Sequence, residues 1–511
     1  MNKWYNILPF TEKNFYNQLS NPHCFVQEVE QNSRANYLYR YLQELETKTI
    51  VSEIEYTDGD YLEDYSSYYV RCFVKYESYC TRLHFFSESF DDGTFTRLIT
   101  RDHPKDGDTF SKILDSYKGC IVARPLPKAI IGRTLLSTYG SDCGRRQYKS
   151  LKEYQINLFG LELKVSSLPF QEQDQVLGAC ATVALWTAFH KTADLFGTTM
   201  PRPAVVTKLA HKAGGETRVF PSCGLSIRQM AQAIRSVGLE PELIKVSPDM
   251  PLVSVIYSYL NFGLPVVLLY QLEEDVAAEN NTNHTVTLTG YSISSNTKIC
   301  REVSLSSPPN LPMTGLKINE FYAHDDQIGP FSRLIVKESS KEEKYPVIFE
   351  RDNKDSAYPT YLIIPVYNKI RIPFSYIQTW IEKLDYLIIR KGLLDGQKPH
   401  EWDIYLDTSN KLKKELAQEL KERAKRKLLL IRQHPRFLWR ISLTYGGQKV
   451  LVLLADATGL GDSIPFYELL WLDSNLESFV ANKLKSMELD PHQVDYLTER
   501  FLEFLQKNTS L

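Results

Sequence analysis

The sequence predicts a fold of the α+β class, with a central core between two flanking α/β modules. The chain has 511 residues, of which 43% are hydrophobic and 24% charged, so it can bury large cores and divides into about three domains. An apolar, Ala-rich stretch over 178–190 has the character of a helix, and 284–291 has that of a strand. Charged residues gather from 338 onwards. We therefore expect domains at 1–165, 166–337 and 338–511.

The N-terminal accessory domain is expected to be α+β and rich in strands. Aromatic and polar residues alternate over 64–76 at the period of a strand. Two more strands are expected over 119–127, which prolines close, and over 131–136. Arg124 and Arg133 lie near the ends of these strands and are candidates for contacts with anions, although ordinary ion pairs explain such arginines more often.

A strand is expected over 157–170, which leads through a Gln-rich loop into a helix near Cys180. Small residues share a face of that helix with the cysteine at three- or four-residue spacing, and these are Ala184, Thr187 and Ala188. Such a helix can pack close to a sheet, and close packing would hold the thiol rigidly.

A second helix is expected between Ser226, whose side chain can cap it, and Gly238, which can end it. Its apolar residues have the spacing of a helix that packs on a core. The polar residues 275–283 are expected to form a loop beside the site.

Three residues of the central domain have side chains suited to thiol-dependent hydrolysis. Cys180 is the candidate nucleophile, because a thiol attacks as its thiolate and the start of a helix favours an anion. His284 can supply an imidazole base, and Asp325 can orient that imidazole. Each residue alone has an ordinary explanation as a core or turn residue. Their joint occurrence in this order favours the catalytic interpretation.

In these motifs the chain resembles the papain-like cysteine peptidases, and especially the bacteriocin-processing peptidases associated with ABC transporters. Those families carry a Gln before a Cys that opens a long helix, as in residues 171–180. They also carry a Gly-x-Pro strand, a His-x-Val-x-x-x-Gly-Tyr strand and an Asp-x-x-x-Gly turn, as at 263–270, 284–291 and 325–329. The resemblance covers residues 166–337 and implies a Cys helix packed on an antiparallel sheet that carries the His and the Asp.

The Gln of the family pattern is displaced in this chain. In those families the Gln that binds the oxyanion usually stands six residues before the Cys, and here Asp174 occupies that position. Gln173 and Gln175 flank it, and either amide would reach a developing oxyanion after a small change in the loop. We favour Gln173.

The resemblance implies a peptidase that cleaves a peptide or isopeptide bond in a protein or peptide substrate through Cys180, His284 and Asp325. The lack of a signal-peptide pattern and of an apolar span predicts that it acts in the cytosol. Asp326 is the alternative to Asp325, although the spacing to the following glycine favours Asp325. The flanking domains would recognise the substrate, restrain the core or bind a regulatory protein. Two other classes stay open: a transglutaminase-like acyltransferase with the same triad, and a scaffold with a degenerate core.

The composition indicates no cofactor, metal or nucleic acid. Sixty Lys and Arg against 62 Asp and Glu leave a formal charge of −2, so no strong field attracts nucleic acid or an anionic membrane. The eight cysteines lack the close pairs that bind zinc and are expected to be free thiols in a reducing cytosol. The N-terminus lacks the pattern of a signal peptide, and no apolar stretch reaches the length of a membrane span.

The C-terminal domain is expected to be a separate α/β module. Residues 357–367 and 448–456 have the pattern of buried strands, and 408–428 that of a charge-dense helix. Such a helix usually presents a solvated face. Residues 456–461 contain glycines but lack the Lys-Ser/Thr of a phosphate loop, so they do not predict a nucleotide site.

Overall fold

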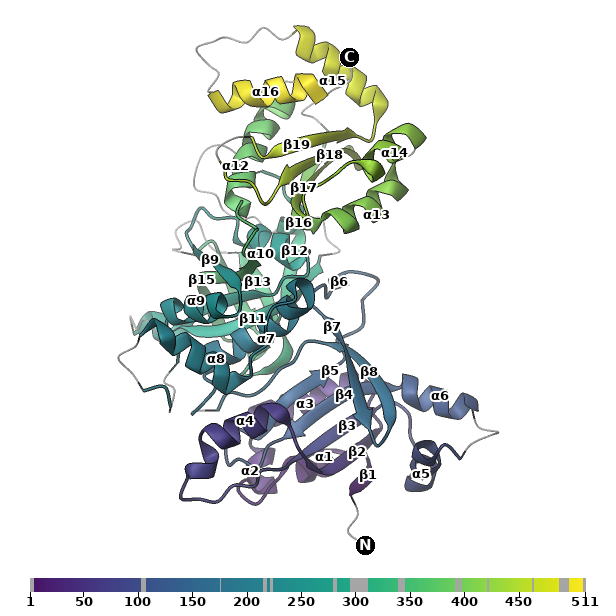
Figure 1. Ribbon diagram of the computed structural model, residues 1–511, viewed down its shortest axis with the longest axis vertical. Coiled ribbons are helices and arrows are strands. Elements are labelled where there is room, and N and C mark those ends of the chain that lie inside the picture. The colour runs from purple at the N-terminus through teal and green to yellow at the C-terminus, as the bar shows by residue number, and fades with distance from the viewer. Residues whose placement is uncertain are drawn as a thin grey trace.

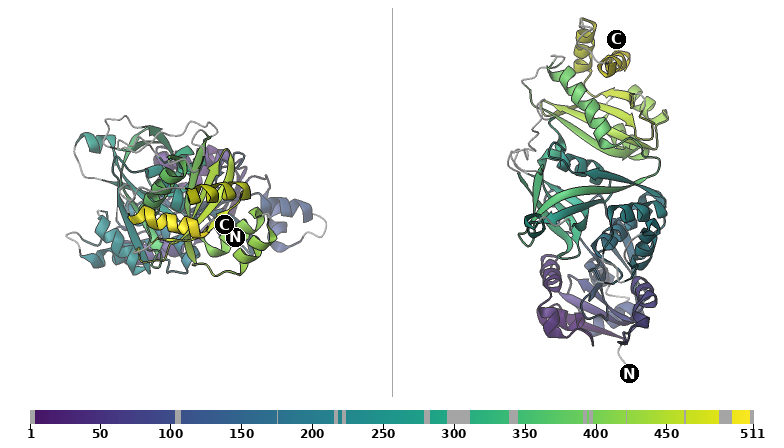
Figure 2. Two further views of the ribbon diagram at one scale, coloured as in Figure 1. Left: turned by 90° about the horizontal axis from the view of Figure 1, so that it is seen from above. Right: turned by 90° about the vertical axis from the view of Figure 1, so that its left-hand side faces the viewer.

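The structure is a computed structural model of mixed helices and antiparallel sheets, in agreement with the expected α+β class. Figure 1 shows three parts that follow one another along the long axis, with the two termini at opposite ends, and Figure 2 shows the same succession from the side. The structure describes every residue except 1–3, 103–106, 175, 215–217, 221–223, 279–282, 295–310, 339–344, 391–393, 395–397, 421, 462–463, 487–495 and 509–511.

The N-terminal part contains a five-stranded antiparallel sheet in which the strand order follows the chain. Its strands are β1 (Tyr5–Pro9), β2 (Thr49–Tyr56), β3 (Cys80–Phe86), β4 (Tyr117–Ala123) and β5 (Ile131–Leu136). Its helices are α1 (Glu12–Leu19), α2 (Val26–Glu30), α3 (Ser33–Glu44), α4 (Gly59–Ser67), α5 (Asp92–Thr100) and α6 (Gly107–Asp115). The strands expected over 119–127 and 131–136 correspond to β4 and β5.

The strand expected over 64–76 is wrong. These residues end α4 and then form a single helical turn, η1 (Tyr69–Arg71), before an irregular segment. The carboxylate of Asp58 caps α4 by accepting hydrogen bonds from two backbone N–H groups at 3.0 Å each. Tyr61 and Tyr69, two helical turns apart, are both buried in one cluster. The aromatic residues therefore follow the helical period, which the apparent alternation hid.

A two-stranded hairpin of β7 (Lys152–Leu158) and β8 (Leu161–Ser167) covers the sheet of the N-terminal part. Residues 157–170 were expected to be one strand, but the chain reverses at Gly160, whose φ of 87° suits glycine. After β8 the chain enters the loop that leads to the central part, as expected.

The central part is built on an eight-stranded sheet that closes on itself, because β10 pairs with both β11 and β15. All its pairings are antiparallel. The strands are β6 (Arg146–Gln147), β9 (Leu239–Lys245), β10 (Val266–Leu272), β11 (His284–Ile293), β12 (Ile318–Asp325), β13 (Gly329–Glu338), β14 (Val347–Arg351) and β15 (Ser356–Tyr367). The domain boundary expected between residues 337 and 338 falls inside this sheet, because charged residues also occur between two strands of one sheet.

The long helix α7 (Cys180–Phe196) packs against this sheet through small and apolar residues. The shared core contains Ala181, Ala184, Leu185, Ala188, Val267, Leu269 and Ile363. The hydroxyl of Thr287 on β11 donates to the carbonyl of Ala184 at 2.7 Å, which ties the helix to the strand. Small side chains allow this approach, as the sequence predicted.

Four more helices belong to the central part: α8 (Pro203–Ala210), α9 (Ile227–Ser236), α10 (Leu252–Leu260) and α11 (Glu273–Ala277). The prediction for α9 is confirmed. Ser226 caps it in a capping box with Gln229, and Gly238 follows its end with a φ of 89°.

The C-terminal part contains a four-stranded antiparallel sheet of β16 (His400–Thr408), β17 (Phe437–Tyr445), β18 (Gln448–Asp456) and β19 (Phe466–Trp471). Its helices are α12 (Phe374–Asp385), α13 (Ser409–Glu419), α14 (Arg423–Ile431), α15 (Ser474–Ser486) and α16 (Tyr496–Asn508), and the short helical segment η4 (Tyr386–Arg390) directly follows α12. The short turns η2 (His211–Ala213) and η3 (Thr314–Lys317) belong to the central part. One hydrophobic core continues from the central part into this sheet.

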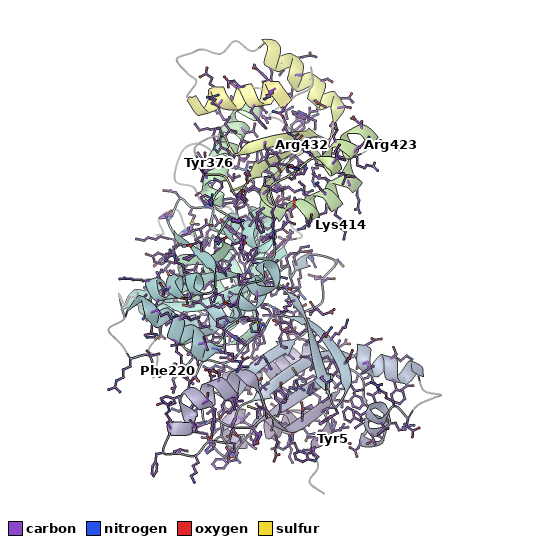
Figure 3. The ribbon with its side chains drawn as sticks, viewed as in Figure 1. Tyr5, Phe220, Tyr376, Lys414, Arg423 and Arg432 are labelled. Atoms are coloured by element: carbon purple, nitrogen blue, oxygen red, sulfur yellow. The ribbon has the colours of Figure 1, made fainter. Side chains whose placement is uncertain are left out.

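The helix expected over 408–428 is two helices, α13 and α14, because the backbone at Leu420 is extended. Figure 3 shows Lys414 and Arg423 on the right-hand side of the C-terminal part, where these two helices lie. The strands expected over 357–367 and 448–456 correspond to β15 and β18. Within the described residues, no helix combines the length and the apolar character needed to cross a membrane.

Candidate functional site

Cys180 is the first residue of α7 and is half-buried. The residue before it, Ala179, has an extended backbone and no side-chain group that could cap the helix. The N–H groups of the first turn are therefore free of a capping side chain, and the partial positive charge of a 17-residue helix acts at the thiol. This is the setting that the sequence predicted for a nucleophile.

A tight loop before α7 is organised by the carboxylate of Asp174. Its Oδ1 atom accepts hydrogen bonds from the backbone N–H of Val176 at 3.1 Å and of Gly178 at 2.7 Å, and also from that of Leu177. Its Oδ2 atom accepts the hydroxyl of Tyr69 at 2.9 Å. Asp174 stands where the resembling families have a Gln, and here it holds the loop that presents the thiol.

His284 is the first residue of β11 and lies beside the end of β12. The two strands are antiparallel, and Thr287 pairs with His324, which brings the start of one strand next to the end of the other. The Nε2 atom of His284 lies 2.9 Å from Oδ1 of Asp325. An ionised carboxylate only accepts hydrogen bonds, so Nε2 carries the proton. The side chain of Cys180 lies near enough to this imidazole to contribute to its raised pKa. The structure thus brings together the predicted cysteine, histidine and aspartate.

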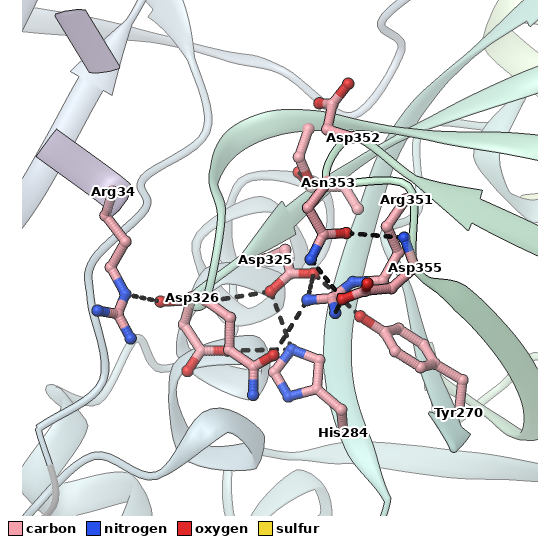
Figure 4. Close-up of polar contacts among 12 residues, drawn as sticks. Arg34, Tyr270, His284, Asp325, Asp326, Arg351, Asp352, Asn353 and Asp355 are labelled. Carbon is pink, nitrogen blue, oxygen red and sulfur yellow. Dashed lines mark hydrogen bonds and ion pairs between the residues drawn. The ribbon is translucent and has the colours of Figure 1, made fainter. Parts of the chain in front are cut away.

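Asp325 ends β12 and is fully buried, and both of its oxygens have partners (Figure 4). Besides His284, Oδ1 accepts the backbone N–H of Gln327 at 3.0 Å. The other oxygen, Oδ2, accepts the hydroxyl of Tyr270 at 2.9 Å and Nη2 of Arg351 at 2.9 Å. These contacts fix the plane of the carboxylate and therefore the direction in which it holds the imidazole.

Burial and charge act in opposite directions on the His284–Asp325 pair. Burial lowers the pKa of His284, but the carboxylate of Asp325 and the hydrogen bonds outweigh it and hold that pKa well above its ordinary value. Burial raises the pKa of Asp325, but His284 and Arg351 outweigh it and hold that pKa far below the ordinary value. The pair therefore favours an imidazolium beside a carboxylate, the charge state that accompanies a thiolate.

Asp326 is equally buried but differently placed. Its Oδ1 lies 3.5 Å from Nε2 of His284, and neither oxygen has a hydrogen-bond partner among the described residues. Burial, with the charge of Asp325, raises the pKa of Asp326 to about 6. Of the two adjacent aspartates, Asp325 makes the shorter and better-supported contact with the imidazole, in line with the preference from the sequence.

His284, Asp325 and Asp326 are also the one group of three potential metal ligands found among the described residues, with ligand atoms within 4.8 Å of one another. Arg351 places a guanidinium 2.9 Å from Asp325, and a cation at that distance opposes a second cation on the same carboxylate. The arrangement suits a hydrogen-bonded triad better than a metal centre.

The glutamines before Cys180 occupy different environments. Gln173, favoured by the sequence as the oxyanion donor, is half-buried and faces a cavity toward the N-terminal part. Gln175 lies outside the described residues. Gln171 is 2% exposed, and its amide nitrogen lies 3.7 Å from the point where a Cβ on Gly178 would stand. Gln171 therefore places an amide donor close to the backbone that leads into the nucleophile.

A cavity of about 570 Å³ lies between the N-terminal part and the loop before α7. Backbone and side chains from α2, α3, η1, the β4–β5 connection and the pre-nucleophile loop surround it, and they include apolar, amide and charged groups. The lining residues are Cys24, Glu28, Gln31, Asn32, Arg34, Tyr69, Tyr76, Leu126, Pro127, Lys128, Ala129, Glu172, Gln173, Asp174 and Val176. Two parts of the chain form its walls, and Gln173 and Asp174 bring the loop that leads to Cys180 into its lining.

Arg34 on α3 links the two loops that carry the triad. Its Nη1 forms an ion pair with Glu172 at 2.9 Å, in the loop before Cys180. Its Nε donates to the carbonyl of Asp326 at 2.8 Å, in the turn after Asp325 (Figure 4). The N-terminal part therefore holds both sides of the site in register.

The two arginines considered as anion contacts have structural partners instead. Arg133 forms an ion pair with Asp58 at 2.7 Å, and the buried Arg124 donates to the carbonyls of Ala129 and Glu172 at 2.9 Å each. Arg124 therefore links the N-terminal part to the loop before α7, whereas Arg133 pairs within the N-terminal part.

Neither the protein-family models nor the curated proteins contain a match to this chain. The functional argument therefore depends on the geometry of the site. Sequence reasoning missed Gln171, Tyr270, Arg34 and Arg351. Tyr270 ends a predicted strand, whereas an arginine at a strand end or on a polar helix gives no signal of a distant carboxylate partner.

Proposed function

We propose that the chain is a cysteine peptidase that hydrolyses a peptide or isopeptide bond. One observation carries the proposal: a thiol at the start of a long helix lies near a buried imidazole that is itself held by an ionised carboxylate. These three groups in this order are what an activated thiol nucleophile requires.

In the proposed reaction the Cys180 thiolate attacks the carbonyl carbon of an amide and forms a tetrahedral intermediate. The backbone N–H of Cys180 and an amide of the preceding loop would donate to its oxyanion. The imidazolium of His284 gives its proton to the leaving amine as the C–N bond breaks, which leaves an acyl-enzyme. Water then attacks the thioester while His284 takes a proton from it, and the thiolate departs with release of a carboxylic acid.

The cavity beside the loop that leads to Cys180 supports a polypeptide as the substrate. Its volume of about 570 Å³ and its lining of amide, charged and apolar groups suit the mixed side chains of a polypeptide. The six cysteines described by the structure are all free thiols, consistent with action in a reducing compartment such as the cytosol. The flanking parts would then select the substrate or restrain access to the triad.

Alkylation of the purified full-length chain tests the proposal. Iodoacetamide or an epoxide is added in limiting amount, and mass spectrometry measures the rate at each cysteine. Cys143 is an internal reference, because it is exposed whereas Cys180 is half-buried. We expect Cys180 to react first, and its labelling to fall by about 10²-fold in His284→Ala, the usual magnitude of assistance by a base.

The variant Cys180→Ala is the matched control, since labelling of the other cysteines should stay as in the wild type. A Cys180 that reacts no faster than Cys143 would contradict the proposal and favour a scaffold with a degenerate core. Incubation with denatured casein, followed by mass spectrometry of the fragments, then identifies the bonds that the wild type cleaves and Cys180→Ala leaves intact.

A further inference from the structure

Arg351 brings a buried positive charge to the far side of Asp325. It ends β14 and its side chain is 2% exposed. Its Nη2 atom donates to Oδ2 of Asp325 at 2.9 Å and to the side-chain carbonyl of Gln327 at 3.0 Å. A buried guanidinium is costly unless it is paired, so its position is determined by these acceptors.

The turn between β14 and β15 fixes the position of Arg351. The backbone N–H of Arg351 donates to the carbonyl of Asp355 at 2.9 Å, and the carbonyl of Arg351 accepts the N–H of Lys354 at 2.8 Å. Its Nη1 lies 3.5 Å from the half-exposed carboxylate of Asp355. A line of polar contacts therefore runs from the surface turn through Arg351 and Asp325 to His284 (Figure 4).

Tyr270 supports the same oxygen from another strand. Its hydroxyl donates to Oδ2 of Asp325 at 2.9 Å, and the guanidinium of Arg351 lies 5.7 Å from the centre of its ring. The carboxylate thus has two donors on the side away from the imidazole. Of these donors Tyr270 is neutral and Arg351 is cationic, with the carboxylate of Asp355 3.5 Å from Arg351. Oδ1 faces His284, which Asp326 also approaches at 3.5 Å.

The cation of Arg351 at Oδ2 of Asp325 weakens the electrostatic effect of the carboxylate on the imidazole at Oδ1. An isolated buried carboxylate would hold the imidazolium proton very strongly and would repel a thiolate on the other side of the ring. Arg351 offsets part of this negative charge. The imidazolium can then release its proton to a leaving amine more readily than it would beside an uncompensated Asp325.

We infer that Arg351 is a positioning residue of this site, which sets the effective charge of Asp325 and thereby the pH at which the Cys180–His284 pair becomes reactive. The inference rests on the proposed function. It assigns to β14, outside the region that resembles the peptidases, an indirect role in the chemistry through Asp325.

The test is the rate of Cys180 alkylation by iodoacetamide against pH, measured on the full chain. In Arg351→Met we expect the midpoint of the rising limb to move up by about one pH unit, because one nearby cation is lost. Arg351→Lys keeps the charge, so its midpoint should lie close to that of the wild type. Lys354→Met is the matched control, since it removes a 76%-exposed cation from the same turn without touching Asp325.

The outcomes separate the inference from the proposed function. If wild-type Cys180 reacts no faster than Cys143, the proposed function fails. If Cys180 is activated but the profiles of the wild type and Arg351→Met coincide, the inference fails. Equal shifts in the Lys and Met variants would show a purely structural role and would overturn it as well. Should Arg351→Met not fold, Tyr270→Phe replaces it, with a smaller shift expected in the same direction and an unchanged profile as the contradicting result.

Discussion

Asp325 and Asp326 face the same nitrogen of His284, at 2.9 and 3.5 Å, but only Asp325 has hydrogen-bond partners for its carboxylate among the described residues. The pKa of Asp325 is held far below its ordinary value, whereas burial raises that of Asp326 to about 6. The pKa values of two neighbouring carboxylates are therefore shifted in opposite directions. This difference makes their roles separable by experiment.

The first prediction concerns the stability of Asp326→Asn. The pKa of Asp326 is about 6 in the folded chain, above its ordinary value of 3.8, so the folded state binds the proton more tightly than the unfolded state. Ionised Asp326 therefore destabilises the fold increasingly as the pH rises from about 4 to above 6. We expect Asp326→Asn to raise the free energy of unfolding at pH 8 by about 2–3 kcal/mol and to have little effect near pH 4. Urea denaturation at both values measures this difference.

Asp325→Asn is the natural control, because it should change the free energy of unfolding at pH 8 in the opposite direction. The folded pKa of Asp325 is depressed, so its ionised form contributes stability above the unfolded pKa, and this contribution is lost as the pH falls through the folded one. The variant should be less stable than the wild type at pH 8, by an amount that shrinks toward acid. Equal effects of the two substitutions at pH 8 would contradict the distinction between these residues.

The second prediction separates the two glutamines that precede the nucleophile. Gln171 is buried with its amide near Gly178, whereas Gln173 faces the cavity. We expect Gln171→Ala to lower the rate of substrate acylation by about 10²-fold, the usual effect of losing an oxyanion donor. Alkylation of Cys180 by iodoacetamide should hardly change, because alkylation forms no oxyanion.

Gln173→Ala is the matched variant for this measurement. It should leave the rate of the acylation step at saturating substrate nearly unchanged and should raise KM, since a cavity residue contributes to substrate binding. The reverse pattern, in which only Gln173→Ala slows acylation, would identify Gln173 as the donor that the sequence favoured.

The third prediction concerns the link between the N-terminal part and the site. Arg34→Met removes the ion pair with Glu172 and the hydrogen bond to the carbonyl of Asp326, and it leaves a buried carboxylate without its cation. We expect a loss of about 3 kcal/mol in stability, typical of breaking a buried pair. We also expect slower alkylation of Cys180. Arg40→Met, on the exposed side of the same helix, should change stability by less than about 0.5 kcal/mol. If Arg34→Met and Arg40→Met change the stability and the alkylation of Cys180 alike, Arg34 does not connect the two loops.

The three residues of the triad were predictable because each belongs to a local motif whose residue types carry the chemistry. Arg351 and Tyr270 were not, since they reach Asp325 from strands 26 and 55 residues away, and only the pairing of the strands brings them together. The same long-range pairing explains why the boundary expected at 337 falls inside the sheet: nothing in the residues after 338 indicates that β14 and β15 return to β13 and β10.

The prediction from local sequence patterns also failed where one pattern of residues is compatible with both a strand and a helix. The alternating aromatic residues of 64–76 fit a strand, but Asp58 caps α4, which continues to Ser67, and the rest of the segment forms a single turn and irregular structure. By contrast, Ser226 with Gln229 forms a complete capping signal, and α9 begins where that signal predicts. Short-range hydrogen-bond motifs were therefore better guides than periodicity alone.

The fourth prediction tests the loop that presents the nucleophile. Asp174→Ala removes the acceptor of three backbone N–H groups and of the Tyr69 hydroxyl, and buried donors without an acceptor are costly. We expect a loss of about 3 kcal/mol in the free energy of unfolding and a marked fall in the alkylation rate of Cys180. Tyr69→Phe deletes only one of these hydrogen bonds, so a loss of about 1 kcal/mol with nearly normal alkylation is expected. Urea denaturation and the alkylation assay on both variants provide the comparison. If Asp174→Ala behaves like Tyr69→Phe, the three backbone contacts do not position the start of α7, and the thiol owes its place to the packing of the helix on the sheet.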